Sequence, residues 1–295
     1  MALLLLALFS PVPAAVVGPP CVQLLNAAGV RLPWVSNGAY DLHHISPTET
    51  QAMLQWPELG GRGLDTAYSY GAKDQKGVGA AVHQTKVPRA EVFVTTKIPC
   101  AGNASAALDY VRQDLSQLQL PYADLVLIHE PSGCKGAAEL QGTWKGLEQA
   151  VALKLARAIG VSNFKVSQLQ SVLASSTIKP AVNQCCMRVG VVDTPTIDFC
   201  KGHDIVYQAY SPLGHGTNTT APPVLLLPEV KAIARAHNVS AAQVAFRFLT
   251  QQGHPLVTAS GSKAYDTEDL DSLGFNLSKS ELTTLRAVKA TSCWS

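Results

Sequence analysis

The sequence predicts an α/β protein that folds as a single (β/α)8 barrel. The first observation is the length of 295 residues, because eight βα units take roughly 250 residues. The second is an alternation of short β-branched runs with amphipathic stretches, which implies parallel strands joined by right-handed crossovers. The third is a set of polar residues at the ends of the predicted strands. Eight such units close most simply as a barrel, and an open doubly wound sheet is the alternative.

The predicted strands are short runs rich in β-branched residues, bounded by turn residues. Residues 91–97 (EVFVTTK) and 124–129 (DLVLIH) are the clearest. The other runs are residues 34–38, 62–65, 156–161, 180–184, 205–210 and 256–259.

The predicted helices fall between these strands. One of them has an apolar face at helical spacing, made by Leu108, Val111, Leu115 and Leu118. Others begin at capping boxes, in which a Ser is followed three residues later by Glu or Gln. The boxes are residues 46–49 (SPTE), 240–243 (SAAQ) and 278–281 (SKSE). Gly77 and Gly79 resemble part of a dinucleotide loop, but no strand precedes them and a third Gly is missing, so we interpret them as a helix start.

The composition excludes several classes of function. The formal net charge is +2 and 15% of the residues are charged, and without a basic cluster nothing favours nucleic-acid binding. An apolar fraction of 47% argues against disorder. The cysteines form no CxxC pair and the histidines show no ligand spacing, so no metal site is predicted.

Residues 1–18 are predicted to be a signal peptide or a disordered leader, and residues 19–295 to form the barrel. An apolar run at residues 3–9 precedes small and Pro residues at 10–15, as at a secretory cleavage site. The run is too short to span a bilayer, which needs about 20 apolar residues. The chain has no Lys or Arg before Arg31. The leader therefore predicts the secretory pathway or the extracellular space, with the cytoplasm as the alternative.

Two further features favour secretion of a glycoprotein. N-glycosylation sequons begin at Asn103, Asn218, Asn238 and Asn276. The chain carries seven cysteines, and an odd number leaves at least one free thiol or an intermolecular link. Free buried cysteines are the alternative explanation.

The polar residues at the strand ends predict an active site. In a barrel these ends converge on one face, where barrel enzymes act. A lone Tyr or His is usually a packing residue, and an isolated Asp–Lys pair is usually structural, but several in register favour a site. They are Asp65, Lys97, His129, Ser162, Asn163, Gln184 and Tyr210.

These motifs resemble the aldo-keto reductase family, in the family's order from about residue 22 to residue 289. Residues 61–67 (GRGLDTA), with Tyr70 shortly after, resemble the family's first signature. The lysine strand, the histidine strand and the second signature are matched by residues 93–97 (FVTTK), 127–129 (LIH) and 157–164 (RAIGVSNF). Residues 180–184 (PAVNQ) and 209–214 (AYSPLG) match the nicotinamide and pyrophosphate segments.

The resemblance implies a reductase that transfers a hydride from NAD(P)H to an aldehyde or ketone. Tyr70 would be the general acid that protonates the carbonyl oxygen. A free Tyr has a pKa near 10, and the Lys97 ammonium is expected to lower it. Asp65 would pair with Lys97, and His129 would donate a hydrogen bond to the substrate oxygen.

The resemblance also implies the cofactor contacts. The nicotinamide carboxamide would be held by Ser162, Asn163 and Gln184, and the ring would stack on Tyr210. The pyrophosphate segment contributes Ser211 and Leu213, and the adenosine end contributes Ser260 and Glu268.

The adenosine segment departs from the family pattern. The family commonly has a Lys-Ser pair and then an Arg, which bind the 2′-phosphate. Ala259 replaces the Lys and Tyr265 the Arg, which weakens phosphate binding because a phosphate needs paired charge. Lys263 can substitute from a shifted position, and Asp269 replaces an Asn. The predicted cofactor is therefore NADP(H), with relaxed discrimination against NAD(H).

Three other departures concern the substrate side. Glu130 replaces a Trp beside His129, which predicts a more polar pocket. The segment from Tyr70 to Gly79 is longer than usual, with Asp74 and Gln75 near the family's Glu. Residues 184–187 (QCCM) lack the family's acidic and His residues.

A disulfide between Cys100 and Cys134 is predicted near the mouth of the site. The two cysteines follow the lysine and histidine strands, so they fall in adjacent loops on one face. Two unpaired loop cysteines are the alternative.

Two other functions fit part of the sequence. A non-catalytic nicotinamide-binding or sensing module is favoured by the weak 2′-phosphate site and the leader, whereas the complete set of four catalytic residues favours the reductase. A secreted glycosidase needs two carboxylates at strand ends, and Asp65 and Glu130 are the obvious candidates. The predicted partner is a small carbonyl compound, with no nucleic acid and no membrane span in the mature chain, and the resemblance implies a monomer.

Overall fold

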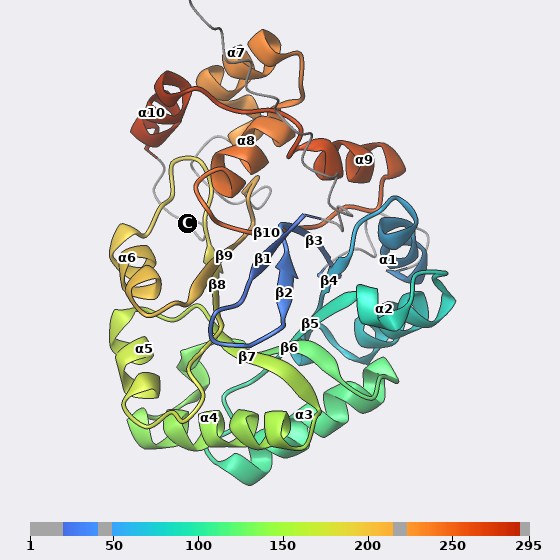
Figure 1. Ribbon diagram of the computed structural model, residues 1–295, viewed down its shortest axis with the longest axis vertical. Helices are drawn as coiled ribbons and strands as arrows, with labels where there is room; N and C mark the ends of the chain where they lie inside the picture. Colours follow the sequence, from blue (N-terminus) through green and yellow to red (C-terminus); the bar gives the residue numbers. More distant parts are fainter. Residues whose placement is uncertain (1–19, 41–48, 215–222, 290–295) are drawn as a thin grey trace, which may run out of the picture.

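Eight parallel strands close into a barrel in the order β10-β3-β4-β5-β6-β7-β8-β9, and helices surround it (Figure 1). The computed structural model describes residues 20–40, 49–214 and 223–289. The closing pair joins β10 to β9 through Leu256 and Ala209. The predicted barrel is therefore confirmed, and the doubly wound alternative is wrong.

Each barrel strand begins and ends within two residues of its predicted run. The strands are β3 (Val35–Gly38), β4 (Gly63–Asp65), β5 (Phe93–Ile98), β6 (Ala123–Ile128), β7 (Ala156–Ser162), β8 (Val182–Cys186), β9 (Val206–Tyr210) and β10 (Leu256–Thr258).

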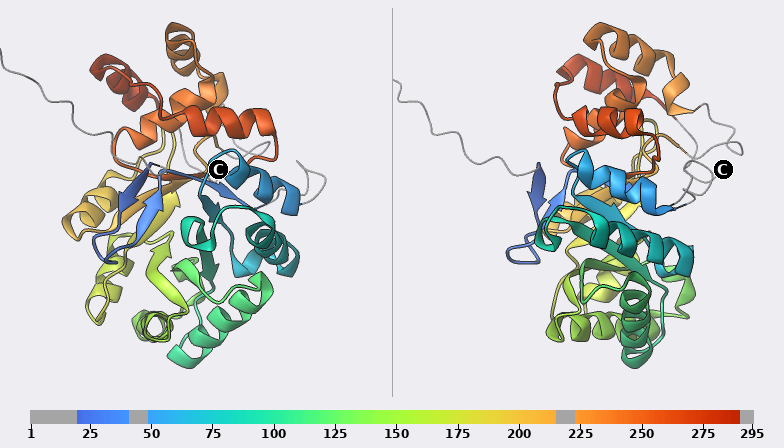
Figure 2. Two further views of the ribbon diagram at one scale, coloured as in Figure 1. Left: turned by 45° about the vertical axis from the view of Figure 1, so that its right-hand side comes forward. Right: turned by 90° about the vertical axis from the view of Figure 1, so that its right-hand side faces the viewer.

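A β-hairpin covers the amino-terminal end of the barrel (Figure 2). It consists of β1 (Cys21–Gln23) paired antiparallel with β2 (Arg31–Pro33). Its Leu24, Val30 and Leu32 form one buried cluster with Phe93 and Leu125 of the barrel strands. Apolar side chains thus fill this end of the barrel, and the predicted polar residues lie toward the opposite end, where the strands finish and barrel enzymes act.

The helices pack around the barrel with their apolar faces inward. They are α1 (Glu49–Glu58), α2 (Ala72–Gln84), α3 (Ala104–Leu118), α4 (Ala137–Ala152), α5 (Val166–Leu173), α6 (Thr194–Gly202), α7 (Pro228–His237), α8 (Ala241–Thr250), α9 (Lys263–Asp271) and α10 (Lys279–Ala287). The predicted face of α3 is buried. The predicted capping boxes begin α8 at Ser240 and α10 at Ser278.

The segment that carries Gly77 and Gly79 lies in the middle of α2, so the predicted helix start there is wrong. The helix begins at Ala72, directly after Gly71, whose φ of 100° favours glycine. Gly79 serves a different purpose, because a Cβ at this position would collide with the backbone carbonyl of Leu118. The glycine thus permits α2 and α3 to approach closely.

Some predictions concern residues outside the described parts of the chain. These are the leader (residues 1–18), the sequon at Asn218 and the first three residues of the capping box at 46–49. Within the described ranges, no helix is both long and apolar enough to cross a membrane. The same ranges contain no cluster of three or more His, Cys, Asp or Glu side chains that could hold a metal ion.

Candidate active site

A buried ion pair lies at the centre of the site. Asp65 ends β4 and Lys97 lies on the neighbouring β5, and their side chains are only 4% and 2% exposed. The Lys97 Nζ donates to Asp65 Oδ1 at 2.5 Å and to the Thr66 backbone carbonyl at 2.9 Å. Gln184 Nε2 donates to the other Asp65 oxygen at 2.8 Å. Both charges are therefore paired and hydrogen-bonded, which a buried pair requires.

The surroundings hold Lys97 in its charged form. Burial alone lowers the pKa of the ammonium, but the Asp65 charge, the adjacent Tyr70 and the hydrogen bonds from Lys97 to both raise it further, so the net pKa lies above its usual value. A fixed positive charge thus persists in the barrel interior throughout the neutral range.

Tyr70 lies directly beside this charge. It ends a short 3-10 turn, Tyr68–Tyr70, between β4 and α2. Its hydroxyl is 3.4 Å from Lys97 Nζ, and Nζ lies 5.1 Å from the ring centroid. Lys97 lowers the pKa of Tyr70, as predicted, but the sequence did not reveal the opposing effects, which are larger. Burial raises that pKa, and although Lys97 opposes this effect, the Asp65 charge adds to it, so the net pKa is raised.

His129 follows β6 and faces the same group. Its ring is edge-on to Tyr70, with ring centroids 5.7 Å apart. Burial, reinforced by the Lys97 charge, lowers the pKa of His129 to about 3, so the imidazole is neutral at physiological pH. The Ser69 hydroxyl lies 3.0 Å from Nδ1. If Ser69 donates to Nδ1, Nε2 carries the proton and becomes a hydrogen-bond donor at the site.

The residues predicted for the nicotinamide form one connected set at the ends of β7, β8 and β9. Asn163 Nδ2 donates to the His129 carbonyl at 3.0 Å, and the Tyr210 hydroxyl donates to Asn163 Oδ1 at 2.7 Å. Ser162 Oγ donates to the Gln184 carbonyl at 2.8 Å. The structure thus brings these residues next to the Asp65–Lys97 pair.

The segment after β9 turns sharply. Ser211 has a φ of 53° and Gly214 a φ of 85°, and Gly214 donates its N–H to the Ser211 carbonyl at 3.0 Å. Leu213 is half-buried and packs on the main core. The buried Arg188 guanidinium lies against Gly214, so a cation lies beside the segment predicted for the pyrophosphate.

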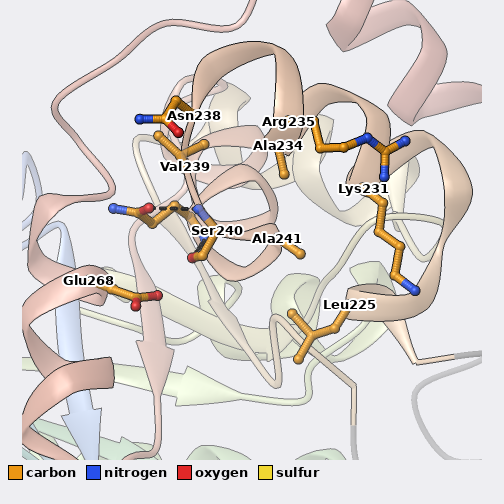
Figure 3. Close-up of a pocket in the computed structure, with 10 residues that line it drawn as sticks. Leu225, Lys231, Ala234, Arg235, Asn238, Val239, Ser240, Ala241 and Glu268 are labelled. Carbon is orange, nitrogen blue, oxygen red and sulfur yellow. Dashed lines mark hydrogen bonds between the residues drawn. The ribbon is translucent and has the colours of Figure 1, made fainter.

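A pocket of about 590 Å3 lies between α7, α8 and α9, apart from the Lys97 group. Figure 3 shows Glu268 on one side of it and Leu225 on the other. Ser260 lies elsewhere, fixed by two hydrogen bonds between its backbone and the Asn37 side chain, at 3.0 and 3.1 Å. The pocket is at the end of the site predicted for the adenosine, and it includes one of the two residues predicted there.

Helix α9 carries four acidic residues and one lysine. Ala259 and Tyr265, which stand at the positions predicted to have lost their cations, are both exposed. Burial and the neighbouring Asp266 and Glu268 charges raise the pKa of Asp269 to about 8. Lys263 is the single cation of α9. Within α9, Lys263 alone could attract a doubly charged phosphate, whereas Lys231 and Arg235 of α7 line the neighbouring pocket.

The predicted disulfide between Cys100 and Cys134 is present, with a Cα–Cα distance of 5.5 Å. It joins the loops that follow β5 and β6, the strands that lead to Lys97 and His129. Thr143 of α4 lies beneath both sulfurs and accepts the backbone N–H groups of Ala101 and Gly102. The loops are thus linked to each other and to α4.

The glycosidase alternative is not supported by the geometry. Asp65 is buried and engaged by Lys97 and Gln184. Glu130 is exposed at the start of a short turn, Pro131–Gly133. A glycosidase needs two carboxylates that are free to act on one bond.

A second layer of polar residues was not predicted from the sequence: Thr66, Ser69, Thr96 and Asp114, together with the role of Gln75 as their partner. One signal for it was present, because Asp114 lies three residues after Val111 on the predicted apolar face of α3. A charged residue within such a face is unusual and indicates a buried partner.

Comparisons with known proteins agree with this geometry. A model described as the aldo/keto reductase family matches residues 35–290. An NAD(P)H-dependent 6′-deoxychalcone synthase from Glycine max is 33% identical over 88% of this chain and 86% of its own length. A glyoxal reductase from Bacillus subtilis is 34% identical over 90% and 92%. An aldo-keto reductase from Bombyx mori, solved in complex with NADP, is similar with a TM-score of 0.83 and 30% identity over 92% of each chain.

The lowered pKa of His129 predicts a pH-dependent stability. The unfolded chain binds a proton at this residue below about pH 6.5, whereas the folded protein does not until about pH 3. The folded state is therefore destabilised as the pH falls through this window. On going from pH 7 to pH 5, the unfolding free energy of the wild type is therefore expected to fall by about 1–2 kcal/mol more than that of His129→Asn.

Urea unfolding at the two pH values measures this difference. His83→Asn, at an exposed histidine in the last turn of α2, is the matched control and should track the wild type. An identical pH dependence for His129→Asn and the wild type would contradict the neutral, half-buried imidazole.

Proposed function

Because the chain belongs to the aldo/keto reductase family, we propose that it reduces small aldehydes or ketones with NAD(P)H, and that Tyr70 is the general acid. The observation that carries the proposal is the position of the Tyr70 hydroxyl, 3.4 Å from the buried Lys97 ammonium. Of the relatives described above, the synthase from Glycine max is named as NAD(P)H-dependent, and the protein from Bacillus subtilis is named as a glyoxal reductase.

The residues around the site fit a nicotinamide cofactor. The Asn163 and Gln184 amides and the Ser162 hydroxyl offer donors and acceptors that match a carboxamide. The Tyr210 ring lies beside them, joined to Asn163. At the far end, Leu225 offers an apolar surface and Glu268 an acceptor for an amino group. When bound, the cofactor supplies the hydride.

The protein's own residues would handle the proton and the orientation. A carbonyl oxygen bound between His129 and Tyr70 would accept a hydrogen bond from His129 Nε2, which orients it. Tyr70 would donate its proton to this oxygen as negative charge develops there. Lys97 would stabilise the resulting phenolate across the 3.4 Å separation. Asp65 would keep Lys97 charged and in place.

The acidic surroundings of α9 support a relaxed choice of cofactor. Discrimination between NADPH and NADH depends on the 2′-phosphate, which needs paired cations. Ala259 and Tyr265 provide none, and the charges of Asp266 and Glu268 both act on Asp269 of the same helix. We therefore propose that this enzyme accepts NADH as well as NADPH.

The site of action is proposed to be the secretory pathway. Disulfides persist in oxidising compartments, and the pairing of Cys100 with Cys134 is consistent with that environment. The sequon residues Asn103, Asn238 and Asn276 are all exposed, so they are open to glycosylation. The apolar start of the sequence supports the same conclusion.

Loss of the Tyr70 hydroxyl should abolish the reductase. Tyr70→Phe removes the proton donor while keeping the ring, and general acid catalysis contributes about 10²–10⁴-fold. We expect kcat with a reactive aromatic aldehyde to fall by that factor, with little change in cofactor affinity. Tyr68→Phe, on the same turn, is the matched control and should retain activity.

Turnover that survives Tyr70→Phe would exclude Tyr70 as the acid. A folded wild type that binds cofactor and turns over no carbonyl would favour a non-catalytic nicotinamide-binding module instead.

Cofactor preference can be altered at two exposed positions. The wild type should bind NADPH and NADH with dissociation constants within about tenfold of each other, and Ala259→Lys with Tyr265→Arg should tighten NADPH at least tenfold by adding paired charge. Fluorescence titration measures both constants. A wild type that binds NADPH hundreds of times more tightly would contradict the proposal.

Secretion can be tested with the full chain expressed in eukaryotic cells. We expect the protein in the medium, and an endoglycosidase should reduce its mass by the glycans on Asn103, Asn238 and Asn276. Each Asn→Gln change at one of these positions should remove the mass difference due to one glycan. A chain that stays in the cytoplasm without glycans would contradict the proposal.

A further inference from the structure

Asp114 is a buried carboxylate that the proposed reaction does not use. It lies on the inner face of α3 and has no exposed surface. Within the described residues, no Lys, Arg or His lies within ion-pair distance of it, although other buried acids such as Asp65 and Asp124 have such partners. A carboxylate in this environment is costly unless its surroundings compensate.

Two neutral donors bind the carboxylate. Gln75 of α2 donates through Nε2 to Asp114 Oδ1, and Thr96 of β5 donates through its hydroxyl to Oδ2. Both donors are fully buried as well. Asp114 therefore connects α3 to the strand that carries Lys97 and to the helix that follows Tyr70.

The same network reaches the ammonium of Lys97. The Thr66 hydroxyl donates to Gln75 Oε1 at 2.5 Å. The backbone carbonyl of Thr66 then accepts the hydrogen bond from Lys97 Nζ at 2.9 Å. The conformation of Thr66, and with it one of the acceptors of Lys97, is thus fixed by a chain of contacts that ends at Asp114.

Asp114 also acts on Lys97 by charge. Burial raises the pKa of Asp114 to about 7, while the Thr96 hydrogen bond and the Lys97 charge lower it. Several charged groups lie on the elements packed against α3, but Lys97 is the charge that shifts Asp114. The others are Lys73, Asp74, Lys76 and His83 on α2, and Glu139, Lys145 and Glu148 on α4. Asp65 lies on β4, beyond Lys97.

We propose that Asp114 is a positioning residue of the reduction, which holds Thr66 against Lys97 through Gln75 and supports the positive charge of Lys97 with its own negative charge. This inference rests on the proposed roles of Tyr70 and Lys97.

The charge of Asp114 determines the direction in which its removal shifts the pKa values of Lys97 and Tyr70. Ionised Asp114 favours the Lys97 ammonium and disfavours the Tyr70 phenolate. Its removal therefore lowers the pKa values of both groups. Reduction requires neutral Tyr70, so the rate should begin to fall at a lower pH. In acid, where Asp114 is itself protonated, its removal should have no effect.

Asp114→Asn is the test variant because it removes the charge and keeps the shape. Its amide oxygen can still accept from Gln75, and its amide nitrogen can donate to the Thr96 hydroxyl, which turns to accept. We expect a kcat equal to that of the wild type near pH 5.5, a decline of kcat in alkali that begins at a lower pH than in the wild type, and unchanged KM values. A purely structural role would lower kcat equally at every pH and leave the position of the alkaline decline unchanged.

A second measurement does not depend on turnover. The difference in phenolate absorbance between a protein and the same protein with Tyr70→Phe reports the titration of Tyr70 directly. We expect this titration to occur at lower pH in Asp114→Asn. If the wild type turns over no carbonyl, the proposed function fails, and the titration still decides the role of Asp114.

Two variants serve as controls. Gln75→Glu combined with Asp114→Asn moves the carboxylate to α2 within the same network, so it should restore the wild-type pH profile. Asp124→Asn removes another buried carboxylate, which pairs with Arg89 and Arg157 at the opposite end of the barrel. It should reduce stability and leave the pH profile unchanged.

The proposal is overturned if Asp114→Asn keeps both the wild-type pH profile and the wild-type titration of Tyr70. If Asp114→Asn does not fold, Thr96→Val replaces it. Without the Thr96 hydrogen bond, Asp114 stays protonated to higher pH, so the rate should again decline earlier, and an unshifted profile would overturn the proposal.

Discussion

The burial of one lysine ammonium inside the barrel is the constraint on which the rest of the site depends. Lys97 is 2% exposed at its side chain, and an ammonium in such a place requires acceptors on every side. Asp65 provides the opposite charge and Thr66 a carbonyl. Gln184 then fills the second oxygen of Asp65. Residues of three strands, β4, β5 and β8, and of the turn after β4 therefore serve this single charge.

The same burial determines the protonation of the neighbouring groups. His129 remains neutral because it is desolvated beside a fixed cation. Tyr70 remains protonated because desolvation and the Asp65 charge outweigh the attraction of Lys97 for a phenolate. The resting site therefore contains one charged pair and two neutral donors, which is the state from which a proton can be given to a carbonyl oxygen.

Much of this arrangement was predictable from the sequence. The barrel follows from strand and helix periodicities that do not depend on distant residues, and the residues at the strand ends follow from the parallel topology. The net pKa of Tyr70 was not predictable in this way, since it depends on how several neighbours bury the hydroxyl. The α2 boundary was missed because Gly77 and Gly79 were interpreted as a helix start, whereas Gly79 permits close packing of α2 against Leu118. Asp114 was missed because its partners come from α2 and β5, far away in the sequence.

The hairpin of β1 and β2 has a consequence for mutational sensitivity. Its apolar side chains, Leu24, Val30 and Leu32, are buried against the barrel strands, so truncation of any of them would leave a cavity at the end of the barrel remote from Lys97. Such a change is expected to lower the stability of the whole fold while it leaves the polar groups around the ammonium in place.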